Sequence, residues 1–365
     1  MYNDDFLQRK LNERKDANAF RQLKIFAGAV DFCSNDYLGI VKNKLIQFDN
    51  KNYNCGSTGS RLLSGNSKLA EETEQQLAAF HESEAALIFN SGYDANMGVL
   101  AAVPQRGDTI LYDQLCHASI RDGIRLSFAQ SFSFGHNDIN DLEKKLKQAA
   151  GNIFIVTESV FSMDGDICPL QEMIILCQQY NAHIILDEAH ATGVIGNSGE
   201  GLAQSLQLHN AIFCRIYTFG KACGCHGAAV LGSAQLKNYL INFARPFIYT
   251  TALPEHSIAA IQKSYNIFPA MIAERNHLQQ LIALFQSAEL KYEKLFSQTP
   301  IQGIIVAGNA AAKEVSNMLL QKGFYVRAVL YPTVPKGKER LRIVLHVFNT
   351  VEEVAGLIES LRFEV

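Results

Sequence analysis

The stretch HIILDEAHATGVIG, residues 183–196, joins the pattern of a buried strand to two acids and a histidine. Its apolar run HIILD predicts a strand that is covered on both faces. Asp187 ends that strand, and Glu188 and His190 follow closely. In open α/β sheets, ligands bind outside the carboxyl ends of the strands. This segment therefore predicts an α/β fold with a functional site at the end of the strand.

The chain on either side repeats this alternation of apolar strands and helical periodicity. The other strand-like runs are AALIFN, TILYD, NIFIVTE, IFCRIYTF and GAAVLG, at 85–90, 109–113, 152–158, 212–219 and 227–232. Apolar strands separated by helices are typical of a mostly parallel sheet with helices on both faces. We expect this sheet in a large domain at 45–255.

Beyond Pro254 the pattern changes to long helices and then to a compact α+β alternation. We place a helical connection and a smaller C-terminal α+β domain at 256–365. The N-terminal segment, 1–44, is expected to pack on that smaller domain.

Composition excludes several classes of protein. The chain has 365 residues, 48% hydrophobic and 19% charged, with a net charge of −3 and no long basic run. The absence of a basic run argues against a nucleic-acid partner. The apolar stretches are shorter than the ~20 residues of a membrane span, so no membrane partner is indicated. The N-terminus is charged and has no secretory pattern, so we expect a cytoplasmic protein.

The eight cysteines are scattered and include no CxxC pair. Free buried thiols are therefore expected rather than disulfides. The stretch CGCHG at 223–227 lacks the second ligand pair that structural zinc sites use, so no metal is expected.

Reactive side chains follow several of the predicted strands. Glu158 ends one strand, and Thr218 ends another, three residues before Lys221. His117 follows TILYD, and the turn Ser91-Gly92-Tyr93 opens a helix after AALIFN. A helix start offers free backbone N–H groups and a positive dipole end to a phosphate.

One cofactor, pyridoxal 5'-phosphate (PLP), needs this set of groups. It requires a lysine for a Schiff base, an acid for its pyridine nitrogen and a phosphate cradle. Lys221, Asp187 and the Ser-Gly-Tyr turn fit these needs, His117 could lie flat against the ring, and His190 could reach its phenolic oxygen.

Each of these residues also has a simpler explanation when taken alone. Lysines such as Lys221 are mostly exposed to solvent. Asp187 could cap the turn that follows it, and His117 could be a helix cap. The PLP hypothesis depends on the combination, in which several chemical roles occur at the strand ends of one sheet.

The chain also resembles a known family, the α-oxoamine synthases, which are PLP enzymes of fold type I. The matching stretches cover nearly the whole chain: FCSNDYLG, SGYDAN, HASIRDG, GHND, TESVFSMDGD, LDEAHATGVIG, YTFGKACGCHGAAVLG, FARPFIYTTALP and YPTVPKGKERLRI. Most specific as a set are VFSMDGD, DEAHATGVIG and TFGKA.

The resemblance implies a role for each site residue. Lys221 would hold the cofactor and move protons, Asp187 would pair with the pyridine nitrogen, and His117 would stack on the ring. Around the phenolic oxygen it implies His190 and Ser162, with Glu158 nearby. At the phosphate it implies the turn Ser91-Gly92-Tyr93 and Thr218. From a second subunit it implies Thr250 and Thr251 at the phosphate, and hence a homodimer with shared active sites.

The implied reaction is an acyltransfer in which an amino acid condenses with an acyl-coenzyme A, or an acyl carrier protein, and carbon dioxide leaves. Arg342 would bind the amino acid's carboxylate, with Asn35 close by. The stretches SNDYLG, FARPFIYTT and DANAFRQ favour alanine and a pimeloyl thioester, as in biotin synthesis. Arg21 would then face the far carboxylate, although a solvated surface arginine explains it equally well.

Other members of the family remain alternatives, namely 2-amino-3-ketobutyrate CoA ligase and serine palmitoyltransferase. A plain aminotransferase or a non-catalytic partner subunit is a more distant alternative. Ala70 stands where most members carry histidine, and Leu330 where some pimeloyl-using members carry arginine. CGCHGA also departs from the usual apolar residue and serine. These departures bear on acyl specificity more than on the chemistry.

Overall fold

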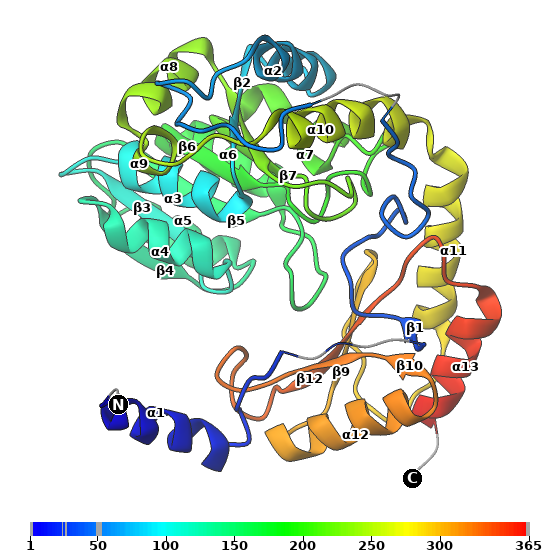
Figure 1. Ribbon diagram of the computed structural model, residues 1–365. Coiled ribbons are helices and arrows are strands. Elements are labelled where there is room, and N and C mark those ends of the chain that lie inside the picture. Colours follow the sequence, from blue (N-terminus) through cyan, green and yellow to red (C-terminus); the bar gives the residue numbers. More distant parts are fainter. Residues whose placement is uncertain (1–2, 24, 26–27, 49–52, 363–365) are drawn as a thin grey trace. The chain divides into compact units, whose positions relative to one another are not determined.

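A computed structural model describes residues 3–23, 25, 28–48 and 53–362. The chain divides into two compact units, which are drawn in Figure 1. The larger unit comprises Leu38–Ser162 and Ile167–Arg275, and the smaller comprises Met1–Tyr37, Met163–Asp166 and Asn276–Val365. The predicted N-terminal segment 1–44 includes residues 1–2, 24 and 26–27, which lie outside the described part.

The larger unit is built on a seven-stranded sheet with the order β2-β8-β7-β6-β5-β3-β4. Its strands are β2 (Ala85–Phe89), β3 (Thr109–Asp113), β4 (Gln130–Phe134), β5 (Ile153–Glu158), β6 (Ala182–Asp187), β7 (Cys214–Thr218) and β8 (Ala228–Gly232). Only β8 runs antiparallel to its neighbours, β2 and β7. The predicted mostly parallel sheet is confirmed.

Helices surround this sheet (Figure 1). They are α2 (Lys68–Phe80), α3 (Gly92–Ala102), α4 (Ala118–Leu126), α5 (Ile139–Leu146), α6 (Leu170–Tyr180), α7 (Leu202–Ser205), α8 (Ala234–Phe243), α9 (Arg245–Ile248) and α10 (Glu255–Ile267), with 3₁₀ turns at His209–Ala211 and Phe268–Ala270. Every residue of β5 is buried, so both faces of the sheet centre are covered, as its apolar sequence predicts.

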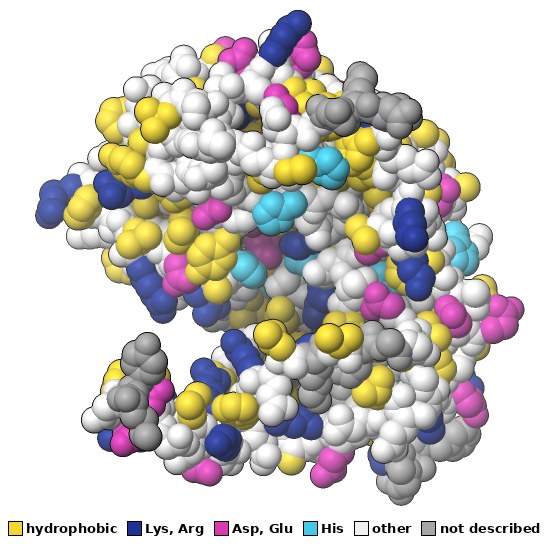
Figure 2. All heavy atoms as spheres, viewed as in Figure 1, with side chains coloured by type: hydrophobic (Ala, Val, Ile, Leu, Met, Phe, Trp, Pro, Cys, Tyr) yellow, Lys and Arg dark blue, Asp and Glu magenta, His cyan; other side chains and the backbone are white. Residues whose placement is uncertain are grey.

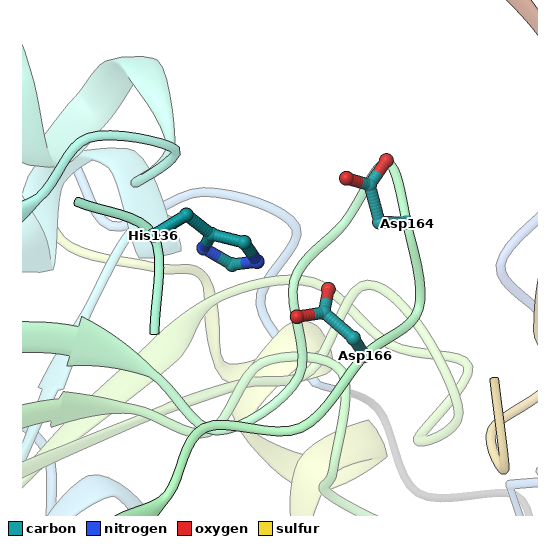
Figure 3. A group of neighbouring side chains, drawn as sticks. All are labelled: His136, Asp164 and Asp166. Carbon is teal, nitrogen blue, oxygen red and sulfur yellow. The ribbon is translucent and has the colours of Figure 1, made fainter. Parts of the chain in front are cut away.

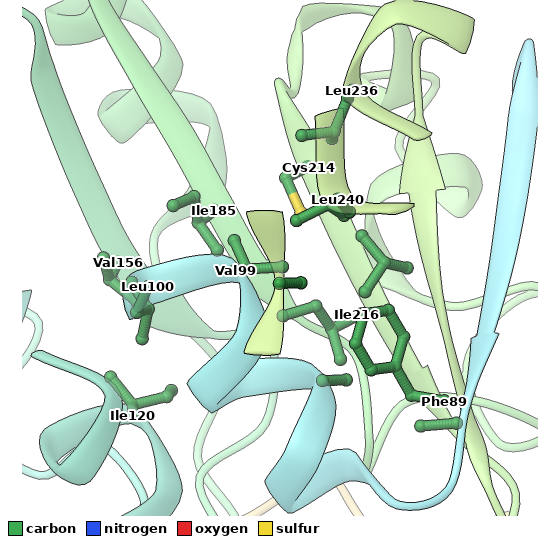
Figure 4. Close-up of a cluster of buried hydrophobic side chains, with 14 of the residues drawn as sticks. Phe89, Val99, Leu100, Ile120, Val156, Ile185, Cys214, Ile216, Leu236 and Leu240 are labelled. Carbon is green, nitrogen blue, oxygen red and sulfur yellow. The ribbon is translucent and has the colours of Figure 1, made fainter. Parts of the chain in front are cut away.

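The core of the larger unit lies between the sheet and α3. Val99 and Leu100 of α3 belong to one buried cluster with Ile185 and Ile216 of the central strands and Phe89 of β2 (Figure 4). Burying such side chains contributes about 1.5–3 kcal/mol each. The cluster therefore fixes α3, and the turn that opens it, on the sheet.

The smaller unit contains two short sheets. In one, β11 (Arg327–Val329), β12 (Arg340–Val344) and β9 (Ile301–Ile305) pair antiparallel in that order. In the other, β1 (Val30–Asp31) pairs parallel with β10 (Phe324–Tyr325). The helices are α1 (Asp5–Asp16), α12 (Asn309–Gln321) and α13 (Val351–Arg362), while α11 (Ile272–Ser287) continues from the larger unit into the smaller.

The turn Met163–Asp166 belongs to the smaller unit although it follows β5 in sequence. Ser297 and Thr299 donate their hydroxyls to the carbonyl of Gly165, at 2.8 and 2.9 Å. Asp164, shown with Asp166 in Figure 3, forms an ion pair with Arg340 of β12. No helix among the described residues has both the length and the apolar character needed to cross a membrane.

Candidate active site

Three neighbouring strands of the larger unit bring the predicted site residues to one edge of the sheet. The parallel register pairs Glu158 of β5 with Asp187 of β6, and Asp187 with Ile216 of β7. Thr218 ends β7 two residues later. The structure thus brings together, at the carboxyl ends of the parallel strands, the groups that the sequence places there. Figure 2 shows histidine, acidic and basic side chains gathered on this unit.

The Asp187 carboxylate is held by two donors. The backbone N–H of Ala189 donates to Oδ1 at 2.9 Å, and the amide Nδ2 of Asn96 donates to Oδ2 at 2.8 Å. Asp187 is only 6% exposed. Two bonds from two elements fix the plane of the carboxylate, as an acid that must meet one ring nitrogen requires.

His117 is the N-cap of α4, and the residue is partly accessible to solvent. Its backbone N–H donates to Glu158 Oε1 at 2.6 Å, and its Nδ1 lies 2.8 Å from the hydroxyl of Ser119. The surrounding protein lowers the pKa of His117, chiefly because it shields the ring from water, although Asp187 acts in the opposite direction.

The loop that carries His117 is organised by Asp113, the buried last residue of β3. Its carboxylate accepts the N–H of Leu115 at 2.8 Å and that of Asn137 at 2.9 Å. The Nδ1 of His136, which is labelled in Figure 3, lies 3.0 Å from the same carboxylate. The stretch GHND thereby ties the end of β4 to the loop that presents His117.

Glu158 is 3% exposed. Burial, followed by the charge of Asp187, raises its pKa to about 8. The ammonium of Lys221 and the N–H of His117 act in the opposite direction. Glu158 therefore gains or loses a proton near neutral pH, inside a site that also contains a fixed acid.

Lys221 and His190 come from the loops after β7 and β6. Lys221 is half-buried, and its carbonyl accepts the N–H of Gly224 at 2.8 Å. His190 is 6% exposed. The turn that carries His190 is anchored by Glu188, whose buried carboxylate accepts the N–H groups of Leu202 and Ala203 at 3.0 and 2.8 Å.

The N-terminus of α3 has the features of a phosphate cradle. Ser91 caps the helix by accepting the N–H of Asp94 at 3.1 Å, which leaves the N–H groups of the first turn to a ligand. A Cβ at Gly92 would lie 2.3 Å from Cγ2 of Thr218, so only glycine lets the helix start approach β7 this closely. The Oγ1 of Thr218 is buried and has no partner among the described residues. Tyr93 is exposed, and its hydroxyl bonds to Asp122.

These groups fit PLP. The unpartnered Thr218 hydroxyl and the helix start suit its phosphate, the solvent-accessible imidazole of His117 suits its ring, and the fixed carboxylate of Asp187 suits its pyridine nitrogen. Ser162 is half-buried in the turn after β5. The individual roles of these residues remain predictions.

Thr250 and Thr251 lie next to Asn90, the residue that precedes the Ser91-Gly92-Tyr93 turn. The amide of Asn90, which directly precedes Ser91, donates to Thr250 Oγ1 at 3.1 Å and to the carbonyl of Thr251 at 2.7 Å. Ala70 is buried in α2 and lines a small pocket with Asn90 and Thr250. The predicted reach of the two threonines into a second subunit stays a prediction.

The expected substrate-binding residues belong to the smaller unit. Arg342 of β12 donates to Asn35 Oδ1 at 2.9 Å, and the Tyr37 hydroxyl donates to the same oxygen at 3.2 Å. Arg21 is exposed and donates to Thr333 Oγ1 at 3.1 Å. Arg342 and Asn35 are therefore brought together, whereas the hydrogen bond of Arg21 is to a different residue, Thr333.

Sequence reasoning missed Asn96 and Ser119, and it noted Glu188 without assigning it a role. Asn96 lies four residues after Gly92, on the same face of α3, so helical periodicity could have placed it beside the cradle. Ser119 lies two residues after His117. Nothing in the sequence shows which carboxylate or ring these side chains meet.

A family model described as aminotransferase class I and II matches residues 27–361. The chain belongs to this family. The chain is also 40% identical, over 98% of its length and 94% of the relative's, to an 8-amino-7-oxononanoate synthase of Emericella nidulans. Further relatives with that name include one from Lysinibacillus sphaericus, 39% identical over 98% of this chain and 97% of its own.

Solved structures show the same fold. A serine palmitoyltransferase of Sphingomonas wittichii matches with a TM-score of 0.86 and 27% identity, over 98% of this chain and 96% of that one. An 8-amino-7-oxononanoate synthase of Francisella tularensis matches with a TM-score of 0.75 and 29% identity, over 91% and 96%.

The family, fold and cofactor predictions are confirmed by these relatives. The chain is an acyltransferase of the α-oxoamine synthase group within the aminotransferase family, it has fold type I, and its cofactor is PLP.

Proposed function

We propose that the chain condenses L-alanine with a pimeloyl thioester to give 8-amino-7-oxononanoate, carbon dioxide and the free thiol carrier. The observation that carries this proposal is the 40% identity, over 98% of the chain, to a relative that bears the name of this activity. The carrier is coenzyme A or an acyl carrier protein.

PLP, when bound, withdraws electrons from the α-carbon of an amino acid. Lys221 holds the cofactor and then removes the proton from the α-carbon of alanine with its Nζ. Asp187 keeps the pyridine nitrogen protonated through its fixed carboxylate, and His117 lies against the ring.

The remaining side chains of the larger unit orient the cofactor. Ser162, Glu158 and His190 surround the phenolic oxygen. At the phosphate, the first-turn N–H groups of Gly92 and Tyr93 and the unpartnered hydroxyl of Thr218 supply donors. Ser91 shapes this helix start as its cap, and its hydroxyl donates to Asp94 Oδ2 at 2.8 Å.

Arg342 and Asn35 bind the carboxylate of alanine. A guanidinium matches a carboxylate with two parallel hydrogen bonds, and Asn35 already fixes the orientation of Arg342. Arg21 binds the carboxylate at the far end of the pimeloyl chain, because burying that anion without a cation is costly.

We further propose that the enzyme is a cytoplasmic homodimer, in which Thr250 and Thr251 reach the phosphate of the partner's site. The support for this is the resemblance of the stretch FARPFIYTTALP to the family, since the bonds from Asn90 to Thr250 and Thr251 lie within one chain. Light scattering of the active protein tests the dimer, and full activity in a monomer would contradict it.

The activity is tested by incubating the purified chain with PLP, alanine and pimeloyl-CoA and detecting 8-amino-7-oxononanoate by mass spectrometry. Parallel reactions with glycine and acetyl-CoA, and with serine and palmitoyl-CoA, test the other family members. A Lys221→Ala variant is the blank. Turnover only with serine and palmitoyl-CoA, or only with a 2-oxo acid and no thioester, would overturn the proposal.

A further inference from the structure

Two side chains outside the expected site connect Asp187 to His117. The Nδ2 of Asn96 lies 2.8 Å from Asp187 Oδ2 and 3.1 Å from the hydroxyl of Ser119. That hydroxyl lies 2.8 Å from Nδ1 of His117. Asn96 and Ser119 are 2% and 1% exposed, so solvent does not replace these bonds.

The chemistry of each group fixes the direction of the bonds. An amide NH₂ has two hydrogens, and Asn96 uses one for Asp187 and the other for Ser119. The Ser119 oxygen therefore accepts from Asn96. The backbone N–H of Ser119 can only donate, and it lies 3.2 Å from Nδ1 of His117, so Nδ1 is an acceptor and the Ser119 hydroxyl at 2.8 Å donates to it as well. Nδ1 thus accepts two hydrogen bonds and carries no proton.

The orientation of the Asn96 amide is itself determined by Asp187. Turning the amide over would place Oδ1 against the carboxylate, where two acceptors would repel each other. In the observed orientation Oδ1 is buried and has no hydrogen-bond partner among the described residues. An unsatisfied buried acceptor is costly, so the bond to Asp187 outweighs that loss.

We propose that Asn96 and Ser119 are positioning residues that hold the Asp187 carboxylate and keep His117 neutral, with its proton on Nε2. This inference rests on the proposed function in one respect, the binding of PLP over His117. A protonated imidazole would repel a protonated pyridine ring stacked on it, whereas the neutral ring does not. The same hydrogen bonds therefore hold the negatively charged carboxylate of Asp187 in place and keep the imidazole of His117 uncharged.

The other charged groups around His117 do not decide its state. Asp187 and Asp122 favour the protonated ring, whereas Lys221 and Arg121 oppose it. Glu158 accepts the backbone N–H of His117 at 2.6 Å. With charges of both signs present, shielding from water and the two donors at Nδ1 keep the ring neutral.

The first test is ¹⁵N NMR of the histidine-labelled, PLP-bound, full-length protein. Loss of a signal in His117→Gln assigns His117. In the wild type we expect an unprotonated Nδ1 and a protonated Nε2. In Ser119→Ala one donor at Nδ1 is lost, so the protonated or Nδ1–H form should become roughly three- to tenfold more populated. This signature is not expected from a purely structural role of Ser119.

The second test is the dissociation constant of PLP, measured by absorbance titration of the stripped protein. Asn96→Ala removes a hydrogen bond to a charged group, so PLP binding should weaken roughly ten- to a hundredfold. Asn152→Ala is the matched control. Its amide likewise donates to a carboxylate, that of Asp108 at 3.0 Å, but at the opposite end of the sheet, so PLP binding should not change.

A wild-type His117 with its proton on Nδ1 would overturn the inference, and so would wild-type PLP affinity in Asn96→Ala. Failure to form 8-amino-7-oxononanoate is a separate outcome. If it occurs while His117 shows the Nε2–H form and Ser119→Ala changes it, the substrate assignment fails and the positioning role is supported.

Discussion

Glu158 and Asp187 end neighbouring parallel strands in register, and both carboxylates are buried. Like charges so close cannot both be ionised without cost. Asp187 receives two fixed hydrogen bonds, whereas Glu158 accepts the N–H of His117 and has a pKa raised to about 8. The site thus contains one acid that is held by two hydrogen bonds and a second whose pKa is raised toward neutral pH.

A Glu158→Gln variant should change how stability depends on pH. Because the folded-state pKa of Glu158 lies above its usual value, the folded protein retains a proton that the unfolded chain loses. The wild type therefore loses stability as the pH rises from about 4.5 through 8. Glutamine keeps an acceptor for the His117 N–H and has no charge. We expect nearly equal stability near pH 4.5 and a gain of about 5 kcal/mol at pH 9.

This difference is measured by urea denaturation of the PLP-free variant and wild type across the pH range. Glu143→Gln is a suitable control, because that carboxylate is exposed on α5 and its pKa is lowered by Lys147 rather than raised. A Glu158→Gln gain that does not depend on pH would contradict the raised pKa.

Asp187→Asn should fold normally and lose activity. Asparagine still accepts from the Ala189 N–H, and the Asn96 amide can turn over to face its new NH₂ group. The neutral side chain cannot hold a proton on the pyridine nitrogen, so exchange of the α-proton of alanine should slow by roughly a hundredfold or more. Proton exchange followed by NMR measures this effect. An exchange rate equal to that of the wild type would refute the role of Asp187.

Gly92→Ala tests the close approach of α3 to β7. The new methyl would lie 2.3 Å from Thr218 Cγ2, so the helix start or Thr218 must shift. Overpacking of this kind costs about 1–3 kcal/mol in unfolding free energy, and it should also weaken PLP binding by roughly tenfold. Gly56→Ala is the control, because its methyl would meet nothing within 4 Å. Equal PLP dissociation constants in both variants would argue against a cradle at Gly92.

Arg21→Ala tests how the acyl donor is recognised. We expect the KM for pimeloyl-CoA to rise roughly tenfold or more, while the KM for alanine barely changes, because Arg342 binds the amino acid. A neutral acyl-CoA of equal length should be affected little. Thr333→Val removes the hydroxyl that Arg21 contacts and separates loss of this contact from loss of the charge. Equal losses with charged and neutral donors would mean that Arg21 is structural.

The sheet was predictable where its strands are buried on both faces. Runs such as HIILD and NIFIVTE are apolar at nearly every position, which identifies them without any knowledge of their neighbours. The edge strand β4, Gln130–Phe134, was not identified, because four of its five residues are exposed and it lacks that apolar signal. The strand order also could not be predicted, since β2 pairs with β8, a strand far away in the sequence.

The sequence by itself determined which chemical groups follow the buried strands, because the end of each apolar strand is visible in the sequence and the sheet brings those ends together. Asp187, Lys221 and His117 were predicted in this way. Only the tertiary structure decided how these groups are held. Asn96 meets Asp187 because α3 packs across the sheet, and Ser119 meets His117 because a turn directs its hydroxyl there. Hydrogen-bond partners depend on distances of a few tenths of an ångström between separate elements, and sequence periodicity does not carry that information.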